Sequence, residues 1–240
     1  IVVRSVWDYH HRVEELYAWI NRAATDTPFM NSAEILITNA HKGYMQDFCN
    51  AGLAVVPTAW VASRSAESLE SIMVAHEWED VILKPAISAS AMQTLRVTRA
   101  NLAAGETLLR EILPRCEVMV QPCLASVREV GETPMVFFDG VFSHAVRRPS
   151  PLDHGEELVS GAPPMPAIEP TQAQRQVAQS IMAALDETPT YARVDLVDGN
   201  DGQPLLLELE LIEPYLFMES RPKSAAMFAS AVLKRLALFS

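Results

Sequence analysis

The fold is decided by Tyr191-Ala-Arg-Val-Asp-Leu-Val197 and by Leu205-Leu-Leu-Glu-Leu-Glu-Leu-Ile-Glu-Pro214, which lies beyond the turn Asp198-Gly-Asn-Asp-Gly202. Both segments have the apolar content of strands, and the glycine-containing turn between them predicts a hairpin. Residues i and i+2 of a strand share a face. We therefore expect the leucines of the second strand on one face and its glutamates on the other: Leu205, Leu207, Leu209 and Leu211 against Glu208 and Glu210.

Acidic side chains on these two strands indicate a functional site. Arg193 and Asp195 share a face of the first strand, and hairpin pairing places Asp195 roughly opposite Glu208. Asp195, Glu208 and Glu210 would then meet beside one guanidinium. Because clustered carboxylates repel each other unless a cation lies among them, the pattern indicates Mg²⁺ shared with nucleotide phosphates. The alternative is a solvated strand face, the usual place for glutamate, but these strands are unusually apolar for the surface.

The composition excludes several classes of protein. A chain of 240 residues can bury a sizeable core, and its hydrophobic content of 49% argues against disorder. The net charge of −11 disfavours nucleic acids and anionic membranes, because phosphate contacts need clustered Lys and Arg. No apolar run has membrane-spanning length, and we find no secretory leader. We expect a cytoplasmic protein without nucleic-acid or membrane partners, either monomeric or a homo-oligomer.

Cysteine and histidine usage disfavours a thiolate or zinc centre. Cys49, Cys116 and Cys123 are odd in number and lack the spacing of metal ligands, which fits a reducing cytoplasm. The histidines show no ligand spacing either, so we expect no zinc site.

Strand and helix signals alternate over residues 1–58, which implies a mostly parallel α/β layer. We expect a strand at 1–6, a helix at 11–23, a strand or helix start at 34–38, a helix at 40–50 that ends at Gly52, and a strand at 53–57. Because a domain rarely opens inside a strand, we also expect further chain before residue 1 in the natural protein.

The remaining chain predicts two further lobes, at 59–120 and 121–240. The first carries a helix at 66–76, strands at 80–85 and 117–122, a Ser/Ala loop at 86–91 and a helix at 99–113. The second carries a hairpin at 134–146, a proline-rich loop at 149–170, a helix at 171–186, the acidic hairpin and a helix at 222–238.

Four motifs, in this order, resemble the ATP-grasp superfamily of carboxylate–amine ligases. They are Lys42 before Gly52-Leu-Ala-Val-Val-Pro57, then Val81-Ile-Leu-Lys84-Pro85, then Val118-Met-Val-Gln-Pro-Cys-Leu124 with Gly131-Glu132, and last Arg193-Val-Asp195 with Glu208 and Glu210. The resemblance extends from about Lys42 to Met218. The chain is most similar to the glutathione-synthetase-like branch, in a bacterial subset that includes ring-forming enzymes; the segments that carry this are Arg4-Ser-Val-Trp-Asp-Tyr9, Phe142-Ser-His-Ala-Val146 and Glu208–Pro214.

This resemblance implies an α/β ATP-grasp fold that holds ATP between two lobes, after an N-terminal α/β layer. It also implies a reaction in which ATP converts a small amino-acid-like carboxylate to an acyl phosphate and an amine displaces phosphate. The bond could form between two molecules, or within one molecule to give a ring. Two alternatives remain: a nucleotide-binding module without turnover, and a structural domain that binds no nucleotide.

The resemblance also implies roles for individual residues. It places Mg²⁺ on Asp195, Glu208 and Glu210, and the tetrahedral intermediate against Arg193. The residues implied for ATP are Lys42 and Lys84 at the phosphates, Ser88 and Ser90 in a loop that lacks the glycine of many relatives, the backbone of Gln121, Pro122, Cys123 and Leu124 at the adenine, and Glu132 at the ribose.

Candidates for substrate recognition come from two segments. Arg4, Trp7 and Asp8 follow the expected first strand, where open α/β sheets commonly bind ligands. Of the pair at 147–148, only one side chain can point into the cleft, and we favour Arg148 for an acidic group. Relatives often continue with a Gly-rich, arginine-bearing segment, whereas residues 149–170 here are acidic and rich in proline.

Overall fold

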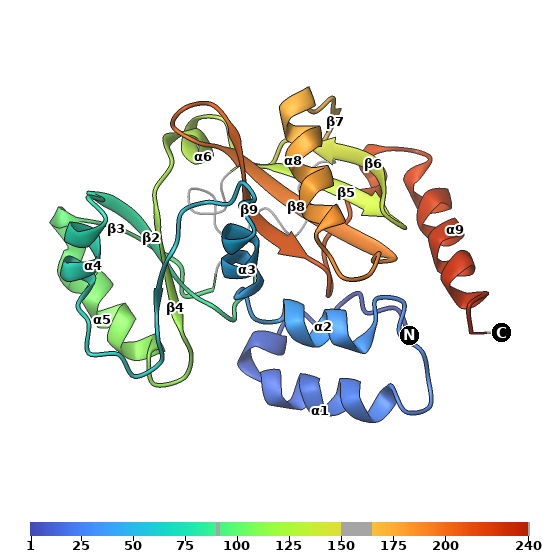
Figure 1. Ribbon diagram of the computed structural model, residues 1–240, viewed down its shortest axis with the longest axis horizontal. Helices are drawn as coiled ribbons and strands as arrows, with labels where there is room; N and C mark the ends of the chain where they lie inside the picture. The colour runs from blue at the N-terminus through green and yellow to red at the C-terminus, as the bar shows by residue number, and fades with distance from the viewer. Residues whose placement is uncertain (90–91, 150–164, 240) are drawn as a thin grey trace.

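The computed structural model describes residues 1–89, 92–149 and 165–239. Within these ranges the strands form a four-stranded sheet, ordered β1-β4-β2-β3, and a five-stranded sheet, ordered β7-β6-β5-β8-β9. All the ladders are antiparallel. Each sheet belongs to a separate lobe, and the N-terminal helices lie below the larger lobe in the view of Figure 1.

The smaller lobe is a sheet covered by two helices. Its strands are β1 (Ala59–Val61), β2 (Asp80–Pro85), β3 (Leu95–Thr98) and β4 (Val118–Pro122). Its helices are α4 (Leu69–Ala75), the 3₁₀ turn η2 (Arg99–Asn101) and α5 (Leu102–Ile112). Leu69, Leu83 and Leu109 are fully buried between helices and sheet, which gives this lobe a core of its own.

The larger lobe contains the acidic hairpin. Its strands are β5 (Thr133–Phe138), β6 (Val141–Val146), β7 (Ala167–Ile168), β8 (Tyr191–Asp198) and β9 (Pro204–Glu210). Its helical segments are α6 (Ala125–Glu129), α8 (Gln172–Ala183), η4 (Met218–Ser220) and α9 (Ser224–Leu236).

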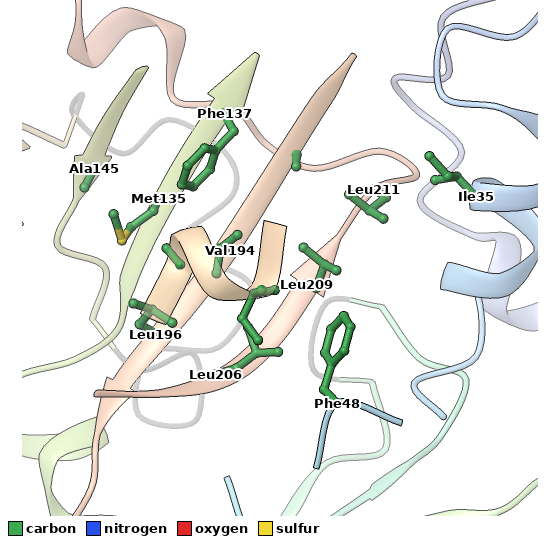
Figure 2. Close-up of a cluster of buried hydrophobic side chains, with 13 residues drawn as sticks. Ile35, Phe48, Met135, Phe137, Ala145, Val194, Leu196, Leu206, Leu209 and Leu211 are labelled. Carbon is green, nitrogen blue, oxygen red and sulfur yellow. The ribbon is translucent and has the colours of Figure 1, made fainter. Parts of the chain in front are cut away.

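The two faces of the larger sheet are covered differently. Figure 2 shows the first face, where Val194, Leu196 and Leu209 pack with α8 and with Phe48 from the N-terminal region. On the opposite face α9 covers only one end, around Tyr191 and Phe138. The ring centre of Phe228, on α9, lies 5.5 Å from that of Phe138. The middle of that opposite face is left for charged side chains.

The expected parallel layer over residues 1–58 is wrong. These residues form η1 (Tyr9–His11), α1 (Val13–Ala23), α2 (Ala33–Asn39) and α3 (Tyr44–Asn50), residues 1–6 belong to no strand, and 53–57 contributes only a bridge from Val55 to Leu206. The extended start is held without a sheet partner, because the Ile1 carbonyl accepts from the Met30 amide and Val3 packs among helical side chains.

The second hairpin strand also departs from simple alternation. A β-bulge shifts the β8–β9 register between Asp195 and Leu196, so that Leu196 pairs with Leu206. Leu206, and not its two neighbours, therefore joins Leu209 and Leu211 in the core. Leu205 and Leu207 instead pack against Val56, Leu124 and Val197. The extra residue at a bulge moves each earlier side chain of the strand to the opposite face of the sheet.

Most of the remaining predictions are confirmed. The helices expected at 11–23, 66–76, 99–113, 171–186 and 222–238 are present, as are strand 80–85 and both hairpins. Segment 34–38 is helical. None of the helices in the described part of the chain has both the length and the apolar character needed to span a bilayer.

Candidate active site

The acidic hairpin pairs in the predicted register. Asp195 lies opposite Glu208, and Arg193 lies opposite Glu210. On β8 the residues at 192, 194 and 196 enter the apolar core, so Arg193 and Asp195 point to the other face. Arg193 and Asp195 therefore lie with the two glutamates of β9 at the middle of the sheet, on the face that α9 does not cover.

Asp195 is the centre of the charge network. Its side chain is fully buried and accepts from Nε and Nη2 of Arg193 at 2.8 and 2.9 Å, and from Nη2 of Arg148 at 2.9 Å. Burial by itself would raise the pKa of Asp195, but the two guanidinium groups outweigh it and lower the pKa below its ordinary value. Asp195 is therefore a permanent anion held between two permanent cations.

The two glutamates of β9 have different environments. Glu208 pairs with Lys42, whose Nζ lies 3.2 Å from Oε1. Burial raises the pKa of Glu208, but Lys42 and Lys84 bring it below the ordinary value. Glu210 pairs with Arg193, yet burial and the charges of Glu208 and Asp195 raise its pKa to about 7. The negative charge at Glu210 is thus the least compensated of the three.

Two lysines approach this face from the other lobe and from the start of α3. Lys42 donates to the carbonyl and the hydroxyl of Ser88, at 2.7 and 3.1 Å, in addition to its contact with Glu208. Lys84 is buried at the end of β2, and burial lowers its pKa. Its ammonium makes no hydrogen bond or ion pair within residues 1–89, 92–149 and 165–239. Ser90, the other loop serine predicted to bind phosphate, lies outside the described residues.

Buried Glu132 and half-buried Arg148 form a second ion pair at the end of the β5–β6 hairpin. Their backbones make a two-way bridge, with N–H to O distances of 2.8 and 3.0 Å, and Arg148 also donates to the Glu132 carboxylate. Gly131 permits this contact: its φ is +85°, and a Cβ there would lie 2.3 Å from the Arg148 carbonyl oxygen. Arg148 therefore links Glu132 to Asp195, and of the pair at 147–148 it is the one directed inward.

The segment after β4 contacts both lobes. The Gln121 side chain donates to Thr58, and the Cys123 amide donates to the Asp80 carbonyl at 2.8 Å. The Cys123 N–H is therefore occupied, whereas the Leu124 N–H has no partner in the described chain. Leu124 also belongs to the apolar cluster that holds Val56 and Val197.

The N-terminal candidates divide into two groups. Arg4 donates to the Pro214 carbonyl at 2.8 Å and lies 5.7 Å from the ring centre of Tyr191. Trp7 is 51% exposed and Asp8 pairs with Arg12 at the surface, so these two side chains point to solvent. Sequence reasoning missed Tyr9, which is buried. Burial, and then the charge of Glu213, raise the pKa of Tyr9 well above its ordinary value.

Glu213 is the other residue that sequence reasoning passed over. It follows Glu210 by three positions, and burial together with the charges of Glu210 and Glu208 raises its pKa to about 8. The signal was present, since Glu213 ends the acidic repeat of the second strand, directly before Pro214.

No metal site is preformed by protein groups alone in the described ranges, where no cluster of three or more His, Cys, Asp or Glu residues is arranged to hold an ion. The predicted carboxylates do share one face, but the protein's own Lys and Arg side chains neutralise them. Oxygen donors remain available on Glu208 and Glu210, because a single oxygen of each is engaged by a cation.

Two lobes that meet over a charged sheet face define a class of enzyme, the ATP-dependent carboxylate–amine ligases of the ATP-grasp superfamily, and this chain belongs to it. Its sequence is 31% identical, over 252 aligned positions, to the cycloserine biosynthesis protein DcsG of Streptomyces lavendulae, covering 98% of this chain and 83% of that protein. No protein-family model matches the sequence.

Solved structures agree with this placement. The crystal structure of the D-cycloserine synthetase DcsG superposes with a TM-score of 0.87 at 29% identity, covering 97% of this chain and 82% of that one. D-alanine–D-alanine ligase from Bacillus anthracis, complexed with ATP, gives a TM-score of 0.67 at 14% identity, over 91% of this chain and 73% of the ligase. The ATP-grasp ligase PsnB gives 0.63 at 18% identity, over 95% and 71%. The last two similarities concern the fold alone.

Proposed function

We propose that this ligase uses ATP and Mg²⁺ to activate the carboxylate of a small amino-acid-like substrate, and that a nitrogen of the same molecule then closes a ring, as in the conversion of O-ureido-D-serine to D-cycloserine. In the first step a carboxylate oxygen attacks the γ-phosphorus and ADP leaves. In the second step the ureido nitrogen bonded to oxygen attacks the acyl carbon, loses a proton and expels phosphate. Water then hydrolyses the carbamoyl group from that nitrogen, and the released carbamate decomposes to CO₂ and ammonia, which leaves the cycloserine ring. The similarity to DcsG over nearly the whole chain supports this reaction.

One observation carries the proposal: Lys42, Lys84 and Arg193 converge on a single buried acidic face. Phosphoryl transfer needs mainly charge neutralisation and alignment, which lysines near the phosphates would provide. Lys84 is suited to this because it is buried and free of a protein partner in the described chain. Lys42 is held in place by Ser88.

The base of ATP would bind at the apolar cluster around Val56, Leu124 and Val197, beside the free Leu124 N–H. That amide would donate to a ring nitrogen, while the carbonyls of Pro122 and Cys123 would accept from the exocyclic amine. Leu205 and Leu207 extend the same apolar surface. Glu132 is buried beside Arg148 and Asp195, so we assign it to the support of Asp195 rather than to the ribose.

The residues present fit Mg²⁺ shared with phosphates. Mg²⁺ is usually held by one or two carboxylates together with substrate oxygens, and Glu208 and Glu210 each keep one oxygen without a cation partner. Asp195 would complete the set of ligands when Arg148 yields one of its contacts. When bound, the ion supplies charge neutralisation at the phosphates.

Arg193 is assigned to the tetrahedral intermediate. A guanidinium carries five N–H donors. Arg193 uses Nε and Nη2 on Asp195 and Glu210, and one Nη1 hydrogen on the Tyr215 carbonyl. One Nη1 hydrogen remains for the oxyanion that forms when nitrogen attacks the acyl phosphate. Because its other contacts fix the guanidinium, this donor is preorganised.

The proposal is tested by ADP release and product analysis. The protein is incubated with ATP, Mg²⁺ and either O-ureido-D-serine, its L-enantiomer or pairs of amino acids, and products are identified by mass spectrometry. Cyclised product from the D-enantiomer is expected; a linked product from an amino-acid pair would favour intermolecular ligation instead. Absence of ADP release with every substrate, together with tight ATP binding, would favour a nucleotide-binding module without turnover. The proposed setting is antibiotic biosynthesis in the cytoplasm.

A further inference from the structure

The segment that follows β9 is held by side chains from distant parts of the chain. Nearly every backbone carbonyl of residues 211–217 accepts from one of them. The donors are Asn31 to Leu211 (2.7 Å), Tyr191 to Ile212 (3.0 Å), Arg4 to Pro214 (2.8 Å), Arg193 to Tyr215 (3.2 Å), and Nε2 of His144 to Leu216 and Phe217 (3.1 and 3.0 Å). A segment fixed at this many points holds its side chains in defined positions.

Glu213 lies in the middle of this fixed segment and has no partner. Its carboxylate makes no hydrogen bond or ion pair to any described residue. The other four acids of the site each have a cation: Glu132 and Asp195 have Arg148, Glu208 has Lys42, and Glu210 has Arg193. Glu213 is nevertheless within the electrostatic range of Arg193 and Lys42. Glu213 is therefore an acid at the site without a cation of its own.

A second polar group without a partner in the described chain belongs to Tyr9, which packs with Ile212 of this segment. Tyr9 is 8% exposed, and its hydroxyl forms no hydrogen bond in the parts of the chain that the structure describes. Glu213 is the charged residue that influences Tyr9 most, ahead of Glu208 and Glu210. Glu213 is half-buried, and Tyr9 packs in the same apolar cluster as Ile212, the residue before it. A hydroxyl and a carboxylate that both lack a protein partner indicate a ligand with hydrogen-bond donors.

We propose that Glu213 binds the cationic amino group of the amino-acid substrate and that Tyr9 forms the adjacent wall of this subsite. The inference rests on the proposed function, which supplies an amino-acid-like substrate. In an α-amino acid the amino group is attached to the carbon next to the carboxyl group. Its partner must therefore lie beside the residue that stabilises the reacting carboxyl group. Glu213 is two residues before Tyr215, whose carbonyl accepts from Arg193 at 3.2 Å.

The alternatives fit less well. A metal ligand would be grouped with further oxygen donors, whereas Glu213 lies three positions beyond Glu210 and belongs to no group of three or more acids arranged to hold an ion in the described ranges. A purely structural acid would be paired, like the other four. Burial and the charges of Glu210 and Glu208 raise the pKa of Glu213 to about 8, so an arriving ammonium would relieve repulsion as well as form hydrogen bonds.

The experiment compares two substrates in two variants. The substrates are O-ureido-D-serine and the counterpart that carries a hydroxyl in place of the α-amino group, and the readout is steady-state ADP release. Glu213→Gln should raise KM for the amino substrate by roughly 10- to 100-fold, as expected for the loss of one charge-assisted hydrogen bond. It should leave KM for the hydroxy counterpart and for ATP unchanged. Glu219→Gln, which changes an exposed acid in η4 just after this segment, is the matched control.

Other outcomes overturn the inference in distinguishable ways. An equal loss with both substrates would make Glu213 a structural residue or a proton acceptor, and a raised KM for ATP or a raised Mg²⁺ requirement would make it part of the nucleotide site. If Glu213→Gln does not fold, Glu213→Asp keeps the carboxylate and must keep the preference for the amino substrate. Wild-type protein that releases no ADP with any substrate would refute the proposed function instead.

Discussion

The two faces of β8 are equally buried and have opposite chemistry. Val194 and Leu196 point into the apolar core, whereas Arg193 and Asp195 point into a network of ions. Burial therefore does not distinguish core from site in this sheet. Apolar burial stabilises the fold, whereas buried ions are retained at a cost in desolvation that their mutual attraction only roughly offsets. Substitutions on the two faces should consequently separate stability from activity.

The largest effect is expected for Asp195→Asn. It leaves Arg193 and Arg148 without their shared anion, and loss of one partner of a buried pair typically costs about 3–5 kcal/mol. Turnover should be lost as well, because the substitution removes a charge that we propose binds Mg²⁺. Urea unfolding and ADP release measure the two losses, with the exposed Asp186→Asn as control. Retained activity in Asp195→Asn would refute the assignment of this face.

On the opposite face, Leu196→Ala should affect stability alone. Removal of a fully buried leucine side chain costs about 2–5 kcal/mol through lost burial and the remaining cavity. The rate per folded molecule, measured below the unfolding transition, should match that of the wild type. A specific loss of kcat here would show that the two faces are not separable.

Lys84→Met tests the same contrast in the smaller lobe. Burial lowers the pKa of Lys84, so an apolar side chain of similar length should leave the free protein as stable or more stable. ATP·Mg²⁺ at about 100 times its Kd should stabilise the wild type by about 2.7 kcal/mol. The variant should lose most of this shift in a thermal melt, whereas the exposed Lys234→Met should keep it.

The smallest expected effect is the pH dependence due to His144. Its Nε2–H donates to two carbonyls, so its Nδ1 accepts from Ser143, and the ring is neutral. Burial lowers its pKa despite those carbonyls. The unfolded chain thus binds the proton more readily, near pH 6.5, and stability should fall as pH falls below that value. His144→Gln should weaken this dependence of Tm on pH; identical slopes would contradict the interpretation.

The hairpins could be predicted because their information is local. The glycine-containing turn predicted the hairpin, and alternation placed Arg193 and Asp195 on one face. The predicted pairing of Asp195 with Glu208 is confirmed, but it depends on the bulge, because the register nearer the turn would place Asp195 opposite Leu207. The helices followed from apolar periodicity in the same way. The bulge beside Leu206 could not be predicted, because the partners of Leu206 are distant in sequence: its amide donates to the Ala54 carbonyl, and its carbonyl accepts from the Val56 amide.

Non-local partners explain the other differences. Residues 1–6 have the composition of a strand, but their hydrogen bonds go to the turn at 28–30 rather than to a sheet. Strand β3 was missed because Leu95-Arg-Val-Thr98 is short and its pairing with β2 depends on the intervening loop. Tyr9 was missed because η1 turns Trp7 and Asp8 outward and Tyr9 inward, which a strand would not do.

If ATP binds as proposed, the bulge in β9 lets one strand contact both the base and the phosphate end of the nucleotide. It turns Leu205 and Leu207 toward the side on which Glu208 and Glu210 lie. An apolar surface and an acidic surface therefore follow each other along a single strand. A regular strand would send those leucines into the interior and leave the surface beside Val197 bare. Deleting one residue at the bulge would therefore turn Leu205 away from this side but leave Glu208 and Glu210 in place. The bulge thus sets the position of the apolar surface relative to the acidic residues.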